Sequence, residues 1–502
     1  MKKFTLIFAL SLMNLLAIGQ TLPPYSYINI NNVSMRITGI GSNFCIPLDD
    51  ESLTQQGNGC LKHEVPIGSG CSTIFQNAIW LGGMDSNDSL HLAGFRFQQV
   101  GDDYWSGPLR LSDASTDLMT VLKYHHVWNV THEEIEHFRQ HYADANYQIP
   151  ADILSWPAHG DEGFAENLAP FVDVNGDGRY NPAEGDYPDI RGDQCLYFIY
   201  NDKFNTHTES GGKKIGVEIH GMAYAYSAPE NEALNNTIFF NYKFFNRSSE
   251  NYHDVFIGIF DEFDIGYGWD DFVGCDVQRG AFFGYNGYDN DTDPNGVLPG
   301  YGTNWPVQVC TVLAGPYMDA DGRDNPDYDG DCNTLFNDSY PLDKYAYNGF
   351  NFGNGVVDDE RLGLCHFTYF NNSWPWNGDP TTAGQYYSNM SSPMPYHTDL
   401  GPDCMFVLPG DSDPCNFGTN GIQPNGGYNQ DGLYWTEEEQ GNQPNDRRGI
   451  GGVGPFTLNA GAVQELDFAY TTVFGNESQT QMQRKGAFID QIRDFFKSNF
   501  TK

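Results

Sequence analysis

Regular alternation of apolar and polar residues is the clearest pattern in this chain. Ile215, Val217 and Ile219 alternate with polar or small residues, and the same period of two recurs at 238–244 and 255–259. This period predicts strands with one buried face. Short polar turns separate these segments, which favours an antiparallel meander over β-α-β units. Further strands are predicted at 33–38, 76–81, 91–97, 194–200, 307–314, 364–370, 404–408 and 463–474.

Two segments have helical signals instead. Thr131 and Glu134 have the spacing of a capping box, and an apolar face at 479–497 predicts a C-terminal helix. Residues 264–460 are rich in Gly, Asn, Asp and Pro, which indicates a loop-rich insertion with brief strands. We therefore expect a mainly β fold, an antiparallel β-sandwich with long loop-rich insertions and a few helices, forming one unit over 20–502.

The first nineteen residues have the features of a secretory signal peptide. Two lysines precede an apolar run of about 15 residues, which is shorter than a spanning helix requires, and Ala17-Ile18-Gly19 resembles a cleavage site. A retained membrane anchor is the alternative interpretation. No later segment is long and apolar enough to cross a bilayer. We expect a secreted, extracellular or cell-surface protein.

Acidic residues greatly outnumber basic ones. The chain holds 66 Asp and Glu against 26 Lys and Arg, a formal net charge of −40. Nucleic-acid binding relies on Lys and Arg that neutralise phosphates, so this charge argues against such a partner. The carboxylates serve solubility or surround divalent cations.

The ten cysteines form an even set in a chain expected to be exported. This combination predicts up to five disulfides, and none of the cysteines has the Cys-x-x-Cys spacing of a zinc or redox motif. Cys45 with Cys60, and Cys404 with Cys415, are the local pairings we favour. The sequence leaves the full connectivity open.

Residues 173–184 carry the strongest chemical signal. They read Asp-Val-Asn-Gly-Asp-Gly-Arg-Tyr-Asn-Pro-Ala-Glu and match the calcium-loop pattern D-x-[DN]-x-[DN]-G-x5-E at every position. Such a loop turns its oxygen donors toward one centre, and the last acid contributes two oxygens. Breaking residues follow the loop, so we predict an isolated, EF-hand-like Ca²⁺ site that stabilises the fold. The predicted ligands are Asp173, Asn175, Asp177, the backbone of Arg179, Asn181 and Glu184.

Two weaker acidic clusters follow. The first, at 319–327, has alternating acids and is a second candidate metal site, with Asp319, Asp321, Asp324 and Asp327 as ligands. Further donors to the same or a neighbouring site are Asn354, Asp358, Asp359 and Glu360. A solvated acidic loop is the alternative. Carboxylates also gather at 261–276, where a cation site, a catalytic pair and a polar strand end all fit.

No residue is assigned a catalytic role. The histidines of His132-Glu133-Glu134-Ile135-Glu136-His137 are five apart, whereas a zinc-protease helix needs them four apart. We find no nucleophile elbow, phosphate loop or dinucleotide fingerprint. Several tryptophans offer sugar-stacking surfaces, although core packing is their commoner fate. These are Trp105, Trp156, Trp269, Trp305, Trp374 and Trp376.

Several motifs together resemble large uncharacterised secreted proteins of Bacteroidota. They are Pro170–Gly178, Gly185–Gln194, Asp271–Asp276, Phe283–Asn286, Phe406–Asp413 and Asn445–Arg448. The resemblance covers most of residues 30–475 and implies export by the type IX secretion system. Family members often carry a C-terminal sorting domain with a Pro-Asn-Pro signature, which this sequence lacks. The family implies a location and calcium rather than an activity.

These observations favour a non-enzymatic, calcium-stabilised structural, adhesive or glycan-binding protein. Its expected partners are extracellular glycans, other surface proteins or further copies of itself. The alternative is a secreted polysaccharide hydrolase that uses paired carboxylates from 261–276, since glycoside hydrolysis needs two acids about 5–10 Å apart.

Overall fold

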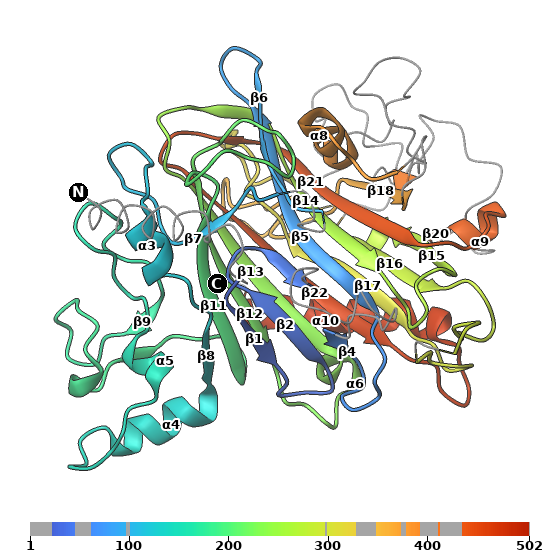
Figure 1. The fold of residues 1–502 in the computed structure, drawn as a ribbon, viewed down its shortest axis with the longest axis horizontal. Helices are drawn as coiled ribbons and strands as arrows, with labels where there is room; N and C mark the ends of the chain where they lie inside the picture. Colours follow the sequence, from blue (N-terminus) through green and yellow to red (C-terminus); the bar gives the residue numbers. More distant parts are fainter. Residues whose placement is uncertain are drawn as a thin grey trace, which may run out of the picture.

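The computed structural model describes residues 23–45, 62–96, 101–296, 299–327, 348–372, 378–391, 410–411 and 434–500. The predicted signal peptide at 1–19 and the predicted strand at 404–408 lie outside these residues. Strands predominate over helices, which confirms the mainly β prediction. Figure 1 shows the long strands of two sheets running through the middle of the molecule.

The larger sheet has ten antiparallel strands within the described residues. In spatial order they are β20 (Trp435–Thr436), β15 (Asp271–Asp276), β16 (Ala281–Asn286), β17 (Val307–Ala314), β22 (Val463–Val473), β13 (Thr237–Asn246), β12 (Val217–Ala225), β11 (Gln194–Asn201) and β7 (Trp105–Ser106), and β8 (Trp128–Thr131) also pairs with β11. Because β22 lies between β17 and β13, the C-terminal part of the chain closes the centre of this sheet.

The second sheet has seven strands in the described part. Their order is β19 (Gly410–Asp411), β18 (His366–Asn371), β21 (Arg447–Leu458), β14 (Tyr252–Phe263), β5 (Ile74–Met84) and β3 (Ser42–Phe44), with β6 (Leu90–Ala93) also paired to β5. Two small sheets complete the β structure. One contains β1 (Tyr25–Ile28), β2 (Ser34–Thr38) and β4 (His63–Glu64), and the other contains β9 (Phe171–Val172) and β10 (Tyr187–Pro188).

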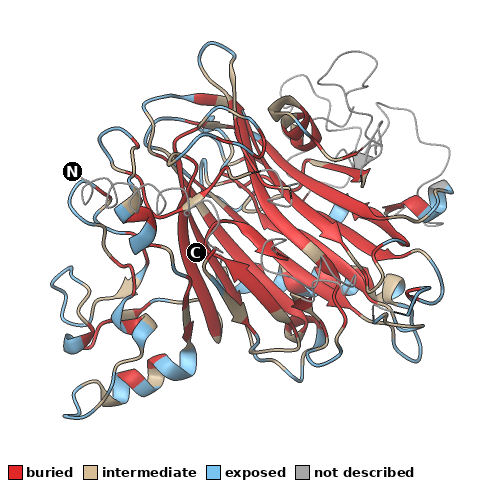
Figure 2. Cartoon of the chain, viewed as in Figure 1, coloured by how far each residue is buried: buried red, intermediate tan, exposed pale blue. Residues whose placement is uncertain are grey.

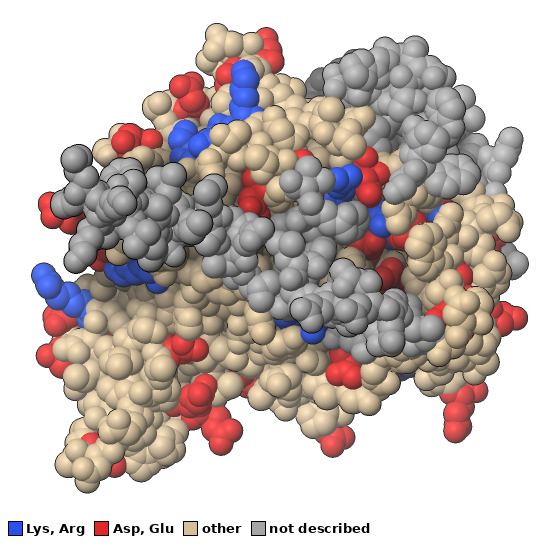
Figure 3. Space-filling view, viewed as in Figure 1, with Lys and Arg blue, Asp and Glu red and all other residues tan. Residues whose placement is uncertain are grey.

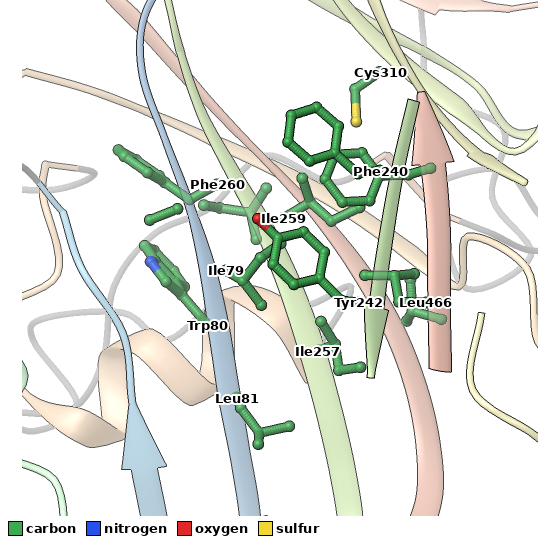
Figure 4. Packing of buried hydrophobic residues seen from close by; sticks show 14 of the residues in the cluster. Ile79, Trp80, Leu81, Phe240, Tyr242, Ile257, Ile259, Phe260, Cys310 and Leu466 are labelled. Carbon is green, nitrogen blue, oxygen red and sulfur yellow. The ribbon is translucent and has the colours of Figure 1, made fainter. Parts of the chain in front are cut away.

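The main core lies between the two large sheets. Phe240 and Tyr242 of β13 point toward Ile257 and Ile259 of β14 (Figure 4), and all four side chains are fully buried. The ring of Phe468 on β22 stacks on Phe240 at 4.8 Å between centroids. Period-two alternation places these residues on one face of each strand, so the β-sandwich follows from the pattern read in the sequence.

A short helix covers the outer face of the seven-stranded sheet. Helix α8 (Ala383–Ser391) packs on strands β21, β14 and β5. Glycines make this approach possible, because a Cβ atom on Gly452 would lie 2.1 Å from the carbonyl oxygen of Met390 and one on Gly82 would lie 2.8 Å from the Met390 side chain. On the same face, Trp80 contacts Tyr386 of the helix with 4.5 Å between ring centroids.

Other helices cover the outer face of the ten-stranded sheet. The long C-terminal helix α10 (Gln481–Phe500) buries Ile489 and Ile492 in a second core on this face. Helix α4 (His132–His141) begins at the predicted capping box, with Thr131 as its N-cap. The remaining helices are short: α3 (Leu118–Lys123), α5 (Ala151–Leu154), α6 (Glu232–Asn235) and α9 (Glu437–Gln440). Figure 2 shows that burial is concentrated in the two sheets and that α4 is exposed along one side.

The structure differs from the sequence predictions in two respects. First, the segment predicted as a loop-rich insertion contributes β15, β16 and the whole of β21 to the sandwich itself. Strand β21 contains four glycines, which lowers strand propensity, and pairing with β14 on one side and β18 on the other overrides that preference.

Second, the predicted maximum of five disulfides is not reached, because several cysteines are free. Cys71, Cys195 and Cys310 carry free thiols and are buried. Cys195 and Cys310 pack as small apolar side chains on strands of the ten-stranded sheet, in the two separate cores. Cys45 is disulfide-bonded. Cys60, Cys404 and Cys415, the other cysteines of the two favoured pairings, lie outside the described residues.

Candidate metal sites

The predicted calcium loop joins the two strands of a small hairpin. It leaves β9 at Val172 and returns through a 3-10 turn at Pro182–Glu184 into β10, where Tyr187 pairs with Val172. The chain therefore continues into a strand rather than the second helix of an EF-hand. This agrees with the prediction of an isolated loop.

Backbone amides surround the first predicted ligand. The two carboxylate oxygens of Asp173 accept hydrogen bonds from the N–H groups of Gly176 and Gly178, both at 2.7 Å. Both glycines have positive φ, 75° and 78°, which other residues adopt only with strain. The hydrogen bond from Gly178 is the main reason that the pKa of Asp173 lies below its ordinary value. Asp173 therefore remains ionised.

The first and last parts of the loop meet through an amide side chain. Nδ2 of Asn175 donates to Glu184 at 2.8 Å and to Asp177 at 3.2 Å. Oδ1 of Asn181 accepts a hydrogen bond from the N–H of Ala183, and Arg179 is exposed. The three carboxylates do not form a group with oxygens within 4.8 Å of one another. Calcium binding by these residues stays a prediction.

The loop is fixed to the body of the protein by groups that the sequence did not single out. Asp186 is fully buried, and its carboxylate accepts hydrogen bonds from the N–H groups of Val174 and Asn181, each at 2.8 Å. The hydroxyl of Tyr180 donates to the carbonyl of Ile153 at 2.6 Å. The only sequence signal for Asp186 is an acid two positions after the loop.

The second predicted metal segment divides into two parts. Asp319 accepts hydrogen bonds from the backbone and side chain of Thr457, which ties it to β21 and away from the other acids. Asp321 and Asp327 are exposed. Asp324 accepts from the N–H of Gly355 and Asp358 accepts from the N–H of Asp321, each at 2.8 Å, so the segment from 321 onward does meet 354–360.

Unpaired oxygens mark that meeting point. Within the described part of the chain, buried Oδ1 of Asp324, Oδ1 of Asp359 and Oε2 of Glu360 receive no hydrogen bond. These acids are not a group of three with ligand atoms within 4.8 Å. Cation binding by Asp319, Asp321, Asp324 and Asp327 also stays a prediction.

A third group of acids lies close enough together to contact one metal ion. Among the described residues, only Glu262, Asp264 and Asp446 form a trio of metal-ligating side chains with ligand atoms all within 4.8 Å. Glu262 lies near the end of β14 and Asp446 just before β21. These strands are antiparallel neighbours with Glu262 opposite Arg448, so the pairing brings together residues more than 180 positions apart.

One arginine lies among these carboxylates. The guanidinium of Arg448 donates to Glu262 and, at 2.6 Å, to Asp446, and its Nε lies 3.5 Å from Asp379. Burial raises the pKa of Glu262 and of Asp264 well above their ordinary values, and Arg448 opposes this shift. Burial therefore disfavours the ionised form of both acids, and the positive charge of Arg448 favours it.

The other carboxylates of 261–276 face different surroundings. Asp261 lies on the opposite face of β14 from Glu262, in the core, where its Oδ1 accepts hydrogen bonds from Tyr470 and Asn77. Asp271 accepts from the N–H of Ile265, and Asp276 pairs with Lys485 of α10. Glu262 and Asp264 belong to the trio with Asp446, and Glu262 is 5% exposed.

The tryptophans and histidines singled out from the sequence are dispersed. Trp156 is buried and Trp105 is half-buried, whereas Trp269 is 58% exposed. Trp374 and Trp376 lie outside the described residues. His137 contacts His141 with 4.5 Å between ring centroids, and this helix contributes no metal-ligating trio among the described residues.

On the face of the molecule shown in Figure 3, acidic side chains are spread rather than gathered in one patch. Asp and Glu occur at the top, left, bottom and right of the described surface. This distribution favours solvation over docking of one basic partner. In the part of the chain that the structure describes, no helix has the length and apolar character needed to cross a membrane.

Comparison with known proteins gives no assignment. No protein-family model matches the chain, and no curated protein matches it.

Proposed function

We propose that this protein is an exported, calcium-stabilised β-sandwich with a structural, adhesive or glycan-binding role outside the cell and no catalytic activity. The observation that carries the proposal is the turn of residues 173–178. The backbone N–H groups of Gly176 and Gly178 donate to the two oxygens of Asp173, and Gly178 stands where the calcium-loop pattern requires glycine. The export signal at 1–19 supports the location.

The loop is suited to a stabilising ion rather than a switch. Asp186 and Tyr180 fix it to the protein body, and a strand follows it. A switch needs an element that moves when the ion binds, as the helices of sensor EF-hands do. Calcium bound here would hold the β9–β10 hairpin closed.

Thermal unfolding with and without EDTA tests the proposal. Binding at 100 times the Kd stabilises the folded state by about 2.7 kcal/mol, so calcium is expected to raise the Tm of the EDTA-treated wild type. Glu184→Gln should make this shift smaller, because it removes the acid that closes the loop. Glu162→Gln neutralises an exposed acid nearby and should retain the shift. A wild-type Tm that does not respond to calcium, or equal shifts in both variants, would overturn the proposal.

Exposed aromatic residues support the glycan-binding form of the role. Trp269 and Tyr288 are 58% and 56% exposed and flank the hydrogen bond between Gly287 N–H and the carbonyl of Asp270, at one end of the β15–β16 hairpin. Exposed aromatic faces stack on the apolar faces of sugars.

Affinity electrophoresis in gels that contain soluble polysaccharides tests this form. Trp269→Ala should remove any retardation, and Leu154→Ala, which truncates another exposed apolar side chain, should not. Release of reducing sugar from the same polysaccharides would contradict the non-catalytic role and favour the hydrolase, for which Glu262 and Asp264 offer carboxylate oxygens within 4.8 Å of each other.

A further inference from the structure

We infer that Glu262, Asp264 and Asp446 form a buried binding site for a divalent cation that prefers oxygen ligands, with calcium as the expected ion. This site is separate from the loop at 173–184. A cation site was one of three interpretations of the acids at 261–276 in the sequence, and Asp446 was not part of it. The site lies at the outer face of the seven-stranded sheet, where β14 ends and β21 begins.

The spacing of the carboxylates fits one ion. Calcium–oxygen distances are about 2.4 Å, so two ligands on opposite sides of the ion are about 4.8 Å apart. The ligand atoms of the three residues all lie within 4.8 Å of one another. One calcium ion can therefore contact all three with little movement of the side chains.

An unpaired oxygen of a buried side chain is the independent observation. Glu262 is 5% exposed, and its Oε1 accepts from Arg448, while its buried Oε2 receives no hydrogen bond from the described residues. No hydrogen bond from the same part of the chain reaches the carboxylate of Asp264. A buried carboxylate oxygen without a partner is unfavourable, so Oε2 of Glu262 is suited to a cation.

The balance of charge supports the same conclusion. Asp379 is a fourth carboxylate beside Arg448, which contacts Glu262, Asp446 and Asp379. Arg96 lies 3.7 Å from both Asp379 and Glu209, so its positive charge is shared with a further acid. Buried charges need partners of opposite sign, and a divalent cation supplies the missing charge.

The surrounding groups hold the carboxylates in place. Arg448 takes one oxygen of Asp446, and Nδ2 of Asn372 donates to the other at 2.9 Å. A Cβ atom on Gly268 would lie 1.9 Å from Oδ1 of Asp264, so the glycine leaves room for this carboxylate. The donors are carboxylate oxygens without His or Cys, which favours calcium or another hard cation over zinc.

Calcium titration of EDTA-treated protein by calorimetry tests the site, with three proteins compared. Asp264→Asn keeps the side-chain shape and is expected to lose one bound calcium relative to wild type. Glu184→Gln should retain the calcium that Asp264→Asn loses, which separates this site from the loop. Near-UV circular dichroism checks that each variant is folded. Equal calcium stoichiometry in wild type and folded Asp264→Asn would overturn the inference.

A crystal of the wild-type protein soaked in terbium provides a test that needs no variant. An anomalous peak among Glu262, Asp264 and Asp446 is expected, because Tb³⁺ replaces calcium at oxygen sites. A peak at the loop without one at this cluster would overturn the inference and leave the proposed function intact. A peak at this cluster without one at the loop would overturn calcium binding by the loop and leave this inference intact.

Discussion

A buried histidine provides the sharpest quantitative prediction. His63 on β4 is 1% exposed, and its Nδ1 lies 2.9 Å from the hydroxyl of Thr73. Its Nε2 is buried and has no partner among the described residues, and the rings of Phe44 and Tyr470 contact the imidazole edge-on. Burial lowers the pKa of His63 from 6.5 to about 3. The folded protein therefore holds His63 neutral at pH values where the unfolded chain protonates it.

This difference fixes the sign of the pH dependence. The contribution of His63 to stability is fully present above pH 6.5 and is lost as the pH falls from 6.5 toward 3. At pH 5 the loss amounts to about 2 kcal/mol, and over the whole interval to about 5 kcal/mol, at 1.36 kcal/mol per pKa unit.

Urea unfolding of wild type and His63→Gln at pH 7.5, 6 and 5 measures the effect. The glutamine cannot take up a proton in this range, so the wild type should lose about 2 kcal/mol more than the variant between pH 7.5 and 5. His132→Gln removes an exposed histidine and serves as the control. Parallel stability curves for wild type and His63→Gln would refute the reasoning.

Three further predictions concern the core. Burial raises the pKa of Asp261 to about 7, so the contribution of its protonated carboxyl to stability is lost as the pH rises from 3.8 to 7. In urea unfolding, Asp261→Asn should therefore stabilise the protein by up to about 4 kcal/mol more at pH 8 than at pH 4, and an equal effect at both pH values would contradict this. Glu218 is fully buried and accepts hydrogen bonds from Leu109 N–H and Arg247, so Glu218→Gln should lower the free energy of unfolding by about 3 kcal/mol, and an unchanged midpoint would speak against the ion pair. Phe468→Ala removes the ring that stacks on Phe240 and should lower the free energy of unfolding by about 3–5 kcal/mol in urea unfolding. A loss below about 1 kcal/mol would show that the neighbouring side chains fill the cavity.

Local sequence determined much of the β-sandwich. Alternation placed β12, β13, β14, β17 and β22 close to their observed bounds, because a strand with one buried face needs an apolar residue at every second position. The cap at Thr131 and the turn around Asp173 were also readable, since each depends on hydrogen bonds between residues at most five positions apart.

Only the tertiary structure decided which residues meet across the chain. Glycine-rich β21 is a strand because β14 and β18 pair with it on its two sides, and it places Asp446 beside Glu262. Glu262 and Asp261 look alike in the sequence, yet one joins a cluster of acids and the other lies in the core. The same holds for the thiols of Cys195 and Cys310, which the packing of the sheets keeps in separate cores. Strand register and sheet order bring these side chains together or hold them apart, and both depend on contacts between residues far apart in sequence.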